Sequence, residues 1–386
     1  MAYNRASVSF EQGPIRPPSE AHSLLLRFTR NCPWNQCSFC PIYKGQPFSR
    51  RPLREITRDI DAVRFVIEDL QTLAAGHSSS GIVPPEVVNT VLTSPGYSAC
   101  YRQVAVWYFH GRGTVFLQDA NSLVMRTQEL VKALRYLQEN VPGIQRITSY
   151  ARSSTMARKS LDELKEIRDA GLNRIHIGLE SGSDRVLDFV RKGSSARQHI
   201  EAGQKVMAAG MTLSEYIMPG LGGAAWSREH AIETARVLNA IDPHFIRLRS
   251  LRVPHRSPLH QDVGEGHLEL LSDDQVVAEI RLLIESLERI HATLTSDHIM
   301  NLLEEVEGKL PEDKEAMLAV IDRYLALPPE EKLLFRLARR GGAVRGLNDL
   351  VNPELRIRLQ RAMAELCAQT GRNLEEVITE LGDQYI

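Results

Sequence analysis

The stretch LLLRFTRNCPWNQCSFC, residues 24–40, joins a short apolar run to a loop that contains three cysteines. Leu24–Phe28 has the length and apolar character of a buried strand. Cys32, Cys37 and Cys40 follow at once in the spacing Cx4CxxC. The stretch therefore predicts a strand whose carboxyl end carries a group of thiols.

The same combination of an apolar run and a polar loop recurs as far as about Ser250. The six predicted strands are Leu24–Phe28, Thr114–Gln118, Arg146–Tyr150, Arg174–Leu179, Leu213–Met218 and Phe245–Ser250. Amphipathic helical segments separate them. Alternation of strands and helices predicts an α/β fold with parallel strands, here a partial (β/α)6 TIM-type barrel.

Helix signals lie between and after these strands. Apolar residues recur every three or four positions from Ile56 to Leu70, and Gly76 follows at a helix C-cap position. Ser160 with Glu163 forms a capping box, Gly171 ends the helix that it starts, and Ser272 with Gln275 forms a second box. These signals predict one helix between the first and second strands, one before the fourth strand and one after the sixth strand.

Three segments flank or interrupt the barrel pattern. Residues 1–22 form an N-terminal extension, and residues 23–260 form the predicted barrel. Residues 77–100 contain SSSG, PP and SPG, which predict an insertion of loops within it. From about Leu271 the strand signal ends and helical patterns dominate, so we expect residues 261–386 to form a helical C-terminal region.

Composition places the chain among ordinary globular proteins. Its 386 residues are 43% hydrophobic, and 47 basic against 48 acidic side chains give a net charge of −1, which favours no polyanionic partner. No run approaches the ~20 apolar residues of a membrane span, and the polar start lacks a secretory signal. Five cysteines are too few for a disulfide framework. We therefore expect a cytoplasmic protein without a membrane partner.

Polar or glycine-rich residues follow every predicted strand. After the cysteine loop they are Gln118–Asn121, Arg152–Ser154, Glu180–Ser183, Met218–Gly223 and the pair Arg249 and Arg252. In a barrel of parallel strands, the loops at the carboxyl ends of the strands form the active site. The placement of these clusters therefore predicts an enzyme, independently of the cysteines.

The three cysteines allow more than one metal chemistry. A structural zinc site needs four ligands, but no second CxxC or HxxxH pair follows Cys40, and His22 is the nearby imidazole. Iron–sulfur clusters are built from thiolates, and three cysteines would leave one iron of a [4Fe–4S] cluster open to a small molecule. We favour the iron–sulfur interpretation, with zinc and free thiols as alternatives.

The run LLLRFTRNCPWNQCSFCPIYKG resembles the cluster-binding loop of the radical S-adenosylmethionine (SAM) superfamily, including the aromatic Phe39 before the last cysteine. The commonest family spacing is CxxxCxxC, and this loop has one additional residue between Cys32 and Cys37. HIGLESGSD, His176–Asp184, is similar to a segment of the coproporphyrinogen-dehydrogenase-like and elongator-like branches. MPGLGG, from Met218, resembles the family's MPGLPG turn.

This resemblance implies the cofactors and the chemistry. Cys32, Cys37 and Cys40 would bind a [4Fe–4S] cluster whose open iron chelates SAM. A reduced cluster would cleave SAM to methionine and a 5′-deoxyadenosyl radical, which abstracts a hydrogen atom from the substrate. Since only Cys100 and Cys367 lie outside the motif, we expect a single cluster.

The resemblance also implies which residues bind SAM. They are Phe39, Asp119, Asn121, Ser153, Glu180, Lys192, Met218 and Gly220. Asp119 would accept the amino group, Glu180 the ribose hydroxyls, and Lys192, or Arg191 beside it, the methionine carboxylate. The glycine turn at Gly220 would let the backbone approach the adenine. Taken singly, Asp119 could instead be a helix cap, Glu180 a surface carboxylate and Lys192 a helix C-terminal charge.

Two features lie beyond the predicted barrel. Asp297 and His298, in LTSDHIMN, are candidates for a catalytic acid–base pair, with a helix N-cap and a surface histidine as the alternative. Four arginines cluster further on, and we expect them at a solvated helix end: Arg336, Arg339, Arg340 and Arg345.

The sequence thus predicts a radical SAM enzyme that abstracts hydrogen from a small-molecule substrate, with a one-electron reductant such as flavodoxin or ferredoxin as partner. One alternative is a radical SAM enzyme that modifies RNA or another macromolecule, which the neutral charge disfavours. The other alternative is a non-catalytic α/β interaction protein stabilised by zinc.

Overall fold

The computed structural model describes residues 3–75, 83–111, 113–370 and 373–383. Its strands form an eight-stranded sheet in the order β1-β4-β5-β6-β7-β8-β9-β10 and a separate pair, β2-β3. The chain divides into two compact units, and strands β6 and β7 and helix α8 contribute residues to both. Each unit is described by itself below.

The first unit comprises Met1–Asn35, Ile42–Ile177 and Gln204–Leu213. Its strands are β1 (Leu24–Arg27), β2 (Thr29–Arg30), β3 (Ser49–Arg50), β4 (Thr114–Gln118), β5 (Arg146–Ala151) and most of β6 (Leu172–Glu180). Strands β1, β4, β5 and β6 pair in parallel, whereas β2 and β3 pair antiparallel. Its helices are η1 (Pro18–Glu20), α1 (Leu53–Ala75), α2 (Pro85–Thr93), α3 (Ala99–Phe109), η2 (Ser122–Val124), α4 (Thr127–Asn140), α5 (Ser153–Arg158) and α6 (Leu161–Asp169).

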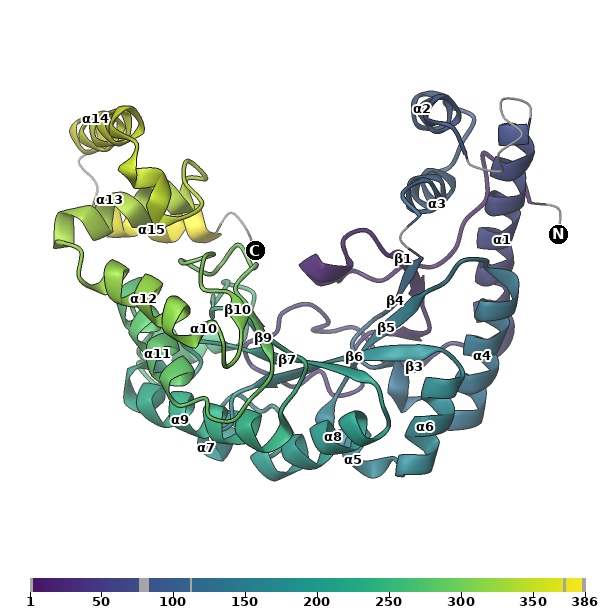
Figure 1. The fold of residues 1–386 in the computed structure, drawn as a ribbon, viewed down its shortest axis with the longest axis horizontal. Coiled ribbons are helices and arrows are strands. Elements are labelled where there is room, and N and C mark those ends of the chain that lie inside the picture. The colour runs from purple at the N-terminus through teal and green to yellow at the C-terminus, as the bar shows by residue number, and fades with distance from the viewer. Residues whose placement is uncertain (1–2, 76–82, 112, 371–372, 384–386) are drawn as a thin grey trace. The chain divides into compact units, whose positions relative to one another are not determined.

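The helices of this unit follow from local sequence. The apolar positions of α1 from Ile56 to Leu70 are buried, as their spacing predicts. Both hydrogen bonds of the capping box form between Ser160 and Glu163 at the start of α6. Gly171 takes φ 111° just after the end of α6. Helices α1, α4 and α6 lie side by side along the strands (Figure 1).

The second unit comprises Gln36–Pro41, Gly178–Gly203 and Ser214–Ile386. Its strands are β7 (Thr212–Ile217), β8 (Phe245–Leu248), β9 (Thr293–Thr295) and β10 (Gly308–Lys309). Strands β7, β8 and β9 pair in parallel, and β10 is antiparallel to β9. Its helices are α7 (Asp184–Phe189), α8 (Ala196–Ala208), α9 (Gly223–Ile241), α10 (Leu259–Gly264), α11 (Asp273–Glu285), α12 (Lys314–Leu325), α13 (Pro329–Arg340), η3 (Leu347–Val351), α14 (Pro353–Thr370) and α15 (Leu374–Asp383). Helices α9, α11 and α12 pack side by side in this order (Figure 1).

The α/β class and the parallel strands of a partial barrel are confirmed. All six predicted strands are present, with ends that differ by two residues or fewer. The expectation that strands end before Leu271 is wrong, because β9 and β10 follow it. Strand β9 has only three residues, which is too short for its sequence pattern to predict a strand, so its strand conformation depends on pairing with β8.

Two further expectations are corrected. Pro85–Thr93, expected within an insertion of loops, forms helix α2, with Pro85 in the first turn and Val87, Val88 and Val91 buried. Gly76 and residues 77–82 lie outside the described residues. The domain boundaries at residues 22 and 260 stay predictions.

Three of the four clustered arginines are not at a solvated helix end, whereas Arg345 is 83% exposed. Arg336, Arg339 and Arg340 on α13 are at most 9% exposed, and their ion-pair partners include Glu375, Glu304 and Asp273, respectively. These three charges are neutralised within the unit, so removal of one partner would leave an unpaired buried charge. Searched over the described residues, the model has no helix that meets the length and hydropathy needed to cross a bilayer.

Candidate functional site

The cysteine loop is closed at its base by strands β2 and β3. Thr29 pairs with Arg50 and Arg30 with Ser49, so the ends of the segment 31–48 are held together. Asn31 and Asn35 adopt left-handed backbone conformations with φ 66° and 50°, which asparagine tolerates better than most residues. The Asn35 backbone N–H donates to the Cys32 sulfur at 3.4 Å. Local sequence therefore shapes the turn that presents Cys32.

In the first unit, Asp119 holds the start of this loop. It follows β4 directly and is fully buried. Its Oδ2 atom accepts hydrogen bonds from the Arg27 guanidinium and from the Asn31 backbone N–H, each at 2.7 Å, and Tyr43 donates to Oδ1 at 3.1 Å. The charge-assisted hydrogen bonds of a buried Arg–carboxylate pair are strong, and loss of one partner would leave an unpaired buried charge. Asp119 thus positions the residue that precedes Cys32.

Two other predicted residues of this unit lie on the loops after β4 and β5. Asn121 is buried, donates to Thr155 at 2.8 Å and leaves its Oδ1 atom without a hydrogen-bond partner. Ser153 is 1% exposed at the start of α5. Beside it, the Arg152 guanidinium lies 5.1 Å from the ring centre of Trp34, within the cysteine loop.

In the second unit, the other half of the loop is fixed by main-chain bonds. The Ser38 N–H donates to the carbonyl of Val190 at 3.0 Å, and the Leu259 N–H donates to the carbonyl of Ser38 at 2.9 Å. Phe39 packs against an apolar cluster that includes Met218 and Leu221. Cys37, which is 8% exposed, and Cys40 lie close to Phe39 in the sequence. The Phe39 ring packs against the cluster that contains Met218, at the end of β7.

Glu180 and Lys192 form an ion pair beside this ring. The Lys192 Nζ lies 2.8 Å from the Glu180 Oε1 and 5.8 Å from the centre of the Phe39 ring. Glu180 has a positive φ of 62°, which turns the chain at the end of β6. A Cβ atom on Gly178 would lie 2.1 Å from the Glu180 carboxylate, so only glycine leaves room for the pair. The structure therefore brings together Phe39, Glu180, Lys192 and Met218.

Glu215 on β7 is a candidate site residue that the sequence analysis missed. It is fully buried, and neither of its carboxylate oxygens has a hydrogen-bond partner. Burial raises its pKa well above the ordinary value, Lys192 lowers it, and Glu180 raises it further. An acidic residue in the middle of a predicted strand was the available signal. A buried acceptor without a donor suits a ligand that brings N–H or O–H groups.

A buried network fixes the glycine turn after β7. The Gly220 N–H donates to Glu279 Oε1 at 2.6 Å, and Ser227 Oγ donates to Glu279 Oε2 at 2.6 Å. His230 lies 3.6 Å from the same carboxylate and 2.8 Å from Ser181 Oγ. Burial lowers the pKa of His230, although Glu279 raises it. The helical region after the barrel thus supports the turn predicted to meet the adenine.

Asp297 and His298 lie at the carboxyl end of β9. Asp297 pairs with Arg247 of β8 at 3.3 Å, and the His298 Nδ1 accepts the Met300 N–H at 3.2 Å. Burial and the charge of Arg249 lower the pKa of His298 to about 4. No α-helix begins at these residues, so the N-cap interpretation does not hold.

The three cysteines form no disulfide, and Cys32 belongs to the first unit whereas Cys37 and Cys40 belong to the second. Across the part of the chain that the structure describes, no three His, Cys, Asp or Glu side chains are gathered as a metal site. Thiols outside disulfides are the donor type that iron–sulfur clusters use. The roles of the cysteines and of the residues implied in SAM binding stay predictions.

Comparison with known proteins finds a family match over part of the chain. Residues 99–235 match the model of the Radical SAM superfamily, and the cysteine loop precedes the matched region. The comparison with curated proteins finds no match. Coproporphyrinogen III oxidase (HemN) from Escherichia coli is 14% identical with a TM-score of 0.44, and the match covers 65% of this chain and 49% of that chain. Archaeal Methanocaldococcus infernus Elp3 is 13% identical with a TM-score of 0.40, and the match covers 54% of each chain. The cobalamin-dependent SAM radical enzyme OxsB is 13% identical with a TM-score of 0.45, and the match covers 94% of this chain and 53% of that chain.

The chain spans about half the length of each of these three proteins. The region matched by the family model contains strands β4 to β7 and the loops that carry Asp119, Glu180 and Gly220. A match to an enzyme superfamily sets aside the alternative of a non-catalytic zinc protein. The match of residues 99–235 shows a Radical SAM domain in this chain, and it supports an enzyme of the radical SAM type.

Proposed function

We propose that Cys32, Cys37 and Cys40 bind a single [4Fe–4S] cluster and that SAM binds beside it, to start hydrogen abstraction from a small-molecule substrate. The observation that carries the proposal is the Cx4CxxC spacing of three cysteines outside disulfides in one loop closed by β2 and β3. In a member of this superfamily, such a donor set fits an iron–sulfur cluster with one open iron.

When bound, the cluster and SAM would supply one-electron reductive cleavage of the sulfonium. The electron would come from a protein donor such as flavodoxin or ferredoxin. The chain's own residues would bind SAM and orient it. Glu180 fits the ribose hydroxyls as an acceptor, and Lys192 fits the methionine carboxylate as a cation; their 2.8 Å pairing keeps both side chains in place beside Phe39.

Two buried acceptors support the binding of a ligand rich in hydrogen-bond donors. Glu215 in the second unit and Asn121 Oδ1 in the first have no partner within the described residues. Unpaired buried acceptors are costly in a folded protein, so a ligand that donates to them gains affinity. We therefore add Glu215 to the predicted SAM-binding set of Phe39, Asp119, Asn121, Ser153, Glu180, Lys192, Met218 and Gly220.

Asp119 has a different balance of contacts. Arg27, Asn31 and Tyr43 already donate to its carboxylate. We propose that its main role is to hold the Cys32 end of the loop. Acceptance of the SAM amino group, implied by resemblance, would use the remaining lone pairs of the same oxygens.

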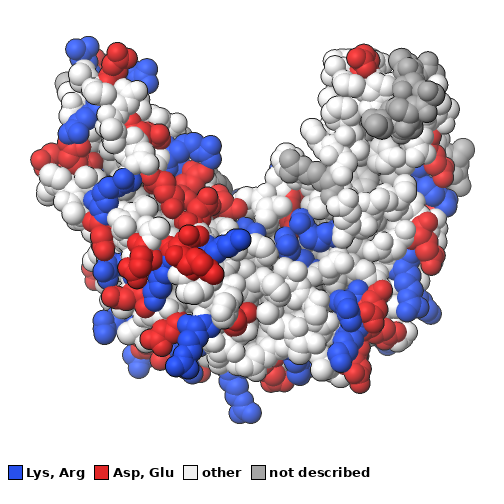
Figure 2. Space-filling view, in the orientation of Figure 1, with Lys and Arg blue, Asp and Glu red and all other residues white. Residues whose placement is uncertain are grey.

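A small-molecule substrate fits the charge distribution better than RNA does. The net charge is −1, and Figure 2 shows acidic and basic side chains interspersed over helices α11, α12 and α13. Proteins that bind RNA phosphates need a continuous basic surface. The face drawn over these helices carries none.

The test is anaerobic reconstitution of the purified protein with iron and sulfide. We expect about four iron atoms per chain, a broad visible absorbance, and 5′-deoxyadenosine when dithionite and SAM are added. The variant C37A should lose all three properties. The matched variant C100A should keep them, because Cys100 lies on α3 outside the loop. Stoichiometric zinc without iron would contradict the proposal.

A further inference from the structure

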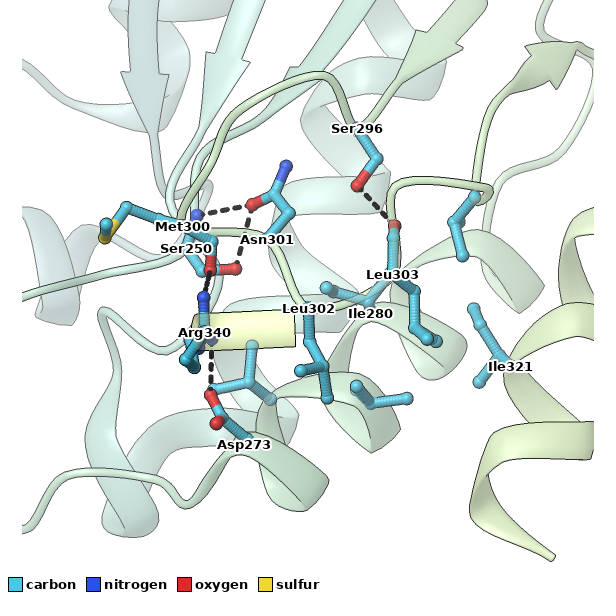
Figure 3. A pocket seen from close by; sticks show the side chains of 13 residues that line it. Ser250, Asp273, Ile280, Ser296, Met300, Asn301, Leu302, Leu303, Ile321 and Arg340 are labelled. Carbon is cyan, nitrogen blue, oxygen red and sulfur yellow. Dashed lines mark hydrogen bonds and ion pairs between the residues drawn. The ribbon is translucent and has the colours of Figure 1, made fainter. Parts of the chain in front are cut away.

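Arg249 and His298 lie at the carboxyl ends of neighbouring strands. Strands β8 and β9 are parallel and in register up to the pair Arg247 and Thr295. Beyond it, Asn301 joins the two segments. The N–H and the hydroxyl of Ser250 donate to Asn301 Oδ1 at 2.9 and 3.0 Å (Figure 3), and Asn301 donates to the Leu248 carbonyl at 2.8 Å. The residues on both sides of Arg249 are therefore tied to the segment that carries His298.

The two arginines at this edge differ in their pairing. Arg247 is buried, pairs with Asp297 at 3.3 Å and donates to Ser214 at 3.0 Å. Arg249 is exposed, and within the described residues no hydrogen bond or ion pair involves its guanidinium. Its N–H donates to the carbonyl of Ile217 at 2.9 Å, just before the turn at Met218. This edge of the sheet therefore carries one positive charge that the neighbouring groups do not neutralise.

His298 supplies a neutral donor beside that charge. Its Nδ1 accepts the Met300 N–H, so the proton of the neutral ring is on Nε2. Burial and the charge of Arg249 lower the pKa of His298 to about 4. At neutral pH the pair therefore consists of one guanidinium and one imidazole N–H.

We propose that Arg249 and His298 form a binding subsite for an oxyanion of the substrate, a carboxylate or a phosphate. A guanidinium binds such a group through two parallel N–H bonds, and the Nε2–H of His298 supplies a further donor. The edge where the subsite lies is the end of the barrel strands at which substrates bind. The inference rests on the proposed function for identifying the occupant as the substrate.

The test follows binding of small anions to the full-length protein. Histidine labelled with 13C at Cε1 is observed by NMR, and the His298 signal is identified as the one missing in H298Q. The probes are propionate, inorganic phosphate and, as a matched cation, propylammonium, all at constant ionic strength. These measurements need no cluster, so their failure is distinct from failure of the proposed function.

We expect propionate and phosphate to shift the His298 signal and to raise its pKa above about 4, because the bound anion stabilises the imidazolium. R249M should weaken this binding about tenfold, and R249K should restore part of it. R281M, at an arginine on α11 that pairs with Asp322 at 2.6 Å, should have no effect.

Three results would overturn the proposal. One is an equal shift with propylammonium, and another is binding that R249M leaves unchanged. The third is displacement of propionate by SAM in the reconstituted protein, since that would assign the subsite to the methionine carboxylate. Binding of propionate and SAM together supports the substrate assignment.

Discussion

The Glu279 carboxylate accepts the backbone N–H of Gly220 at 2.6 Å, although the two residues are separated by 59 positions in the sequence. Gly220 lies in the turn after β7, and Glu279 lies on α11 in the region after the barrel. Glu279 is 4% exposed, and Ser227 satisfies its other oxygen. Helix α11, in the C-terminal helical region, therefore holds in place the glycine turn that is predicted to bind SAM.

The variant E279A should weaken SAM binding. It would leave the Gly220 N–H and Ser227 without their acceptor, and the turn would lose its fixed position. We expect the dissociation constant of SAM to rise about tenfold, measured by calorimetry on the reconstituted protein. Iron content should be unchanged, because the contacts that Glu279 makes are with Gly220, Ser227 and His230.

The conservative variant E279Q retains an oxygen that can accept from Gly220, so it should restore most of the affinity. E285A, on the exposed end of the same helix, is the matched control and should bind SAM normally. An E279A protein with unchanged SAM affinity would show that Glu279 has a purely structural role.

Replacement of Asp119 should disturb the cysteine loop. D119N removes the charge that Arg27 meets in a buried site, and such a change costs about 3 kcal/mol of unfolding free energy. Because Asn31 precedes Cys32 and donates to the same carboxylate, iron incorporation should also fall. The measurements are chemical unfolding and iron analysis after reconstitution.

The control for this prediction is D162N at an exposed position of α6. It should alter neither property. Normal iron content in D119N, together with lost SAM binding, would instead favour the implied role of Asp119 as an acceptor for the SAM amino group.

Replacement of Glu215 by glutamine should stabilise the protein at pH values above the acidic range. Its pKa is raised in the folded state, so the folded chain holds this proton more tightly than the unfolded chain does. The stabilisation is present below the ordinary pKa of 4.5 and is lost as the pH rises toward the folded value. The unfolding free energy of E215Q relative to the wild type should therefore increase with pH.

Urea unfolding of both proteins at about pH 5 and about pH 8 measures this difference. If Glu215 also binds SAM, E215Q should weaken that binding despite its greater stability. A difference in unfolding free energy that is independent of pH would contradict the raised pKa.

Acid should destabilise the protein through Glu20. This buried carboxylate lies before β1 and meets Ser23 at 2.5 Å and Arg146 at 3.1 Å. Burial alone would raise its pKa, but His176 at 3.6 Å, the hydrogen bond from Ser23 and the charge of Arg146 lower the pKa to about 2. A lowered pKa contributes stability above the ordinary value of 4.5, which is lost as the pH falls toward about 2.

The shift corresponds to about 3 kcal/mol at neutral pH, so E20Q should be less stable there by a similar amount. The stabilities of E20Q and the wild type should converge as the pH approaches about 2. E68Q, at an exposed position of α1, should follow the wild type at every pH. The measurement is denaturant unfolding across the acidic range.

Local sequence accounts for most of the fold. The runs Leu24–Leu26 of β1 and Val115–Leu117 of β4 are apolar and buried, and burial of such runs is the main source of folding free energy. The box at Ser160 forms because its two hydrogen bonds span only three residues. By contrast, the three residues of β9 have no such pattern, and β8 provides the partner that makes them a strand.

The sequence by itself determined the strands of the barrel, the loop with three cysteines, and the polar residues at the strand ends, because hydrophobic periodicity and motif spacing are local properties. Only the tertiary structure decided that Asp119 meets Arg27, that Glu215 is buried without a donor, and that Glu279 supports Gly220. Which charged group meets which partner depends on how segments far apart in the chain pack, and burial then sets the strength of each interaction.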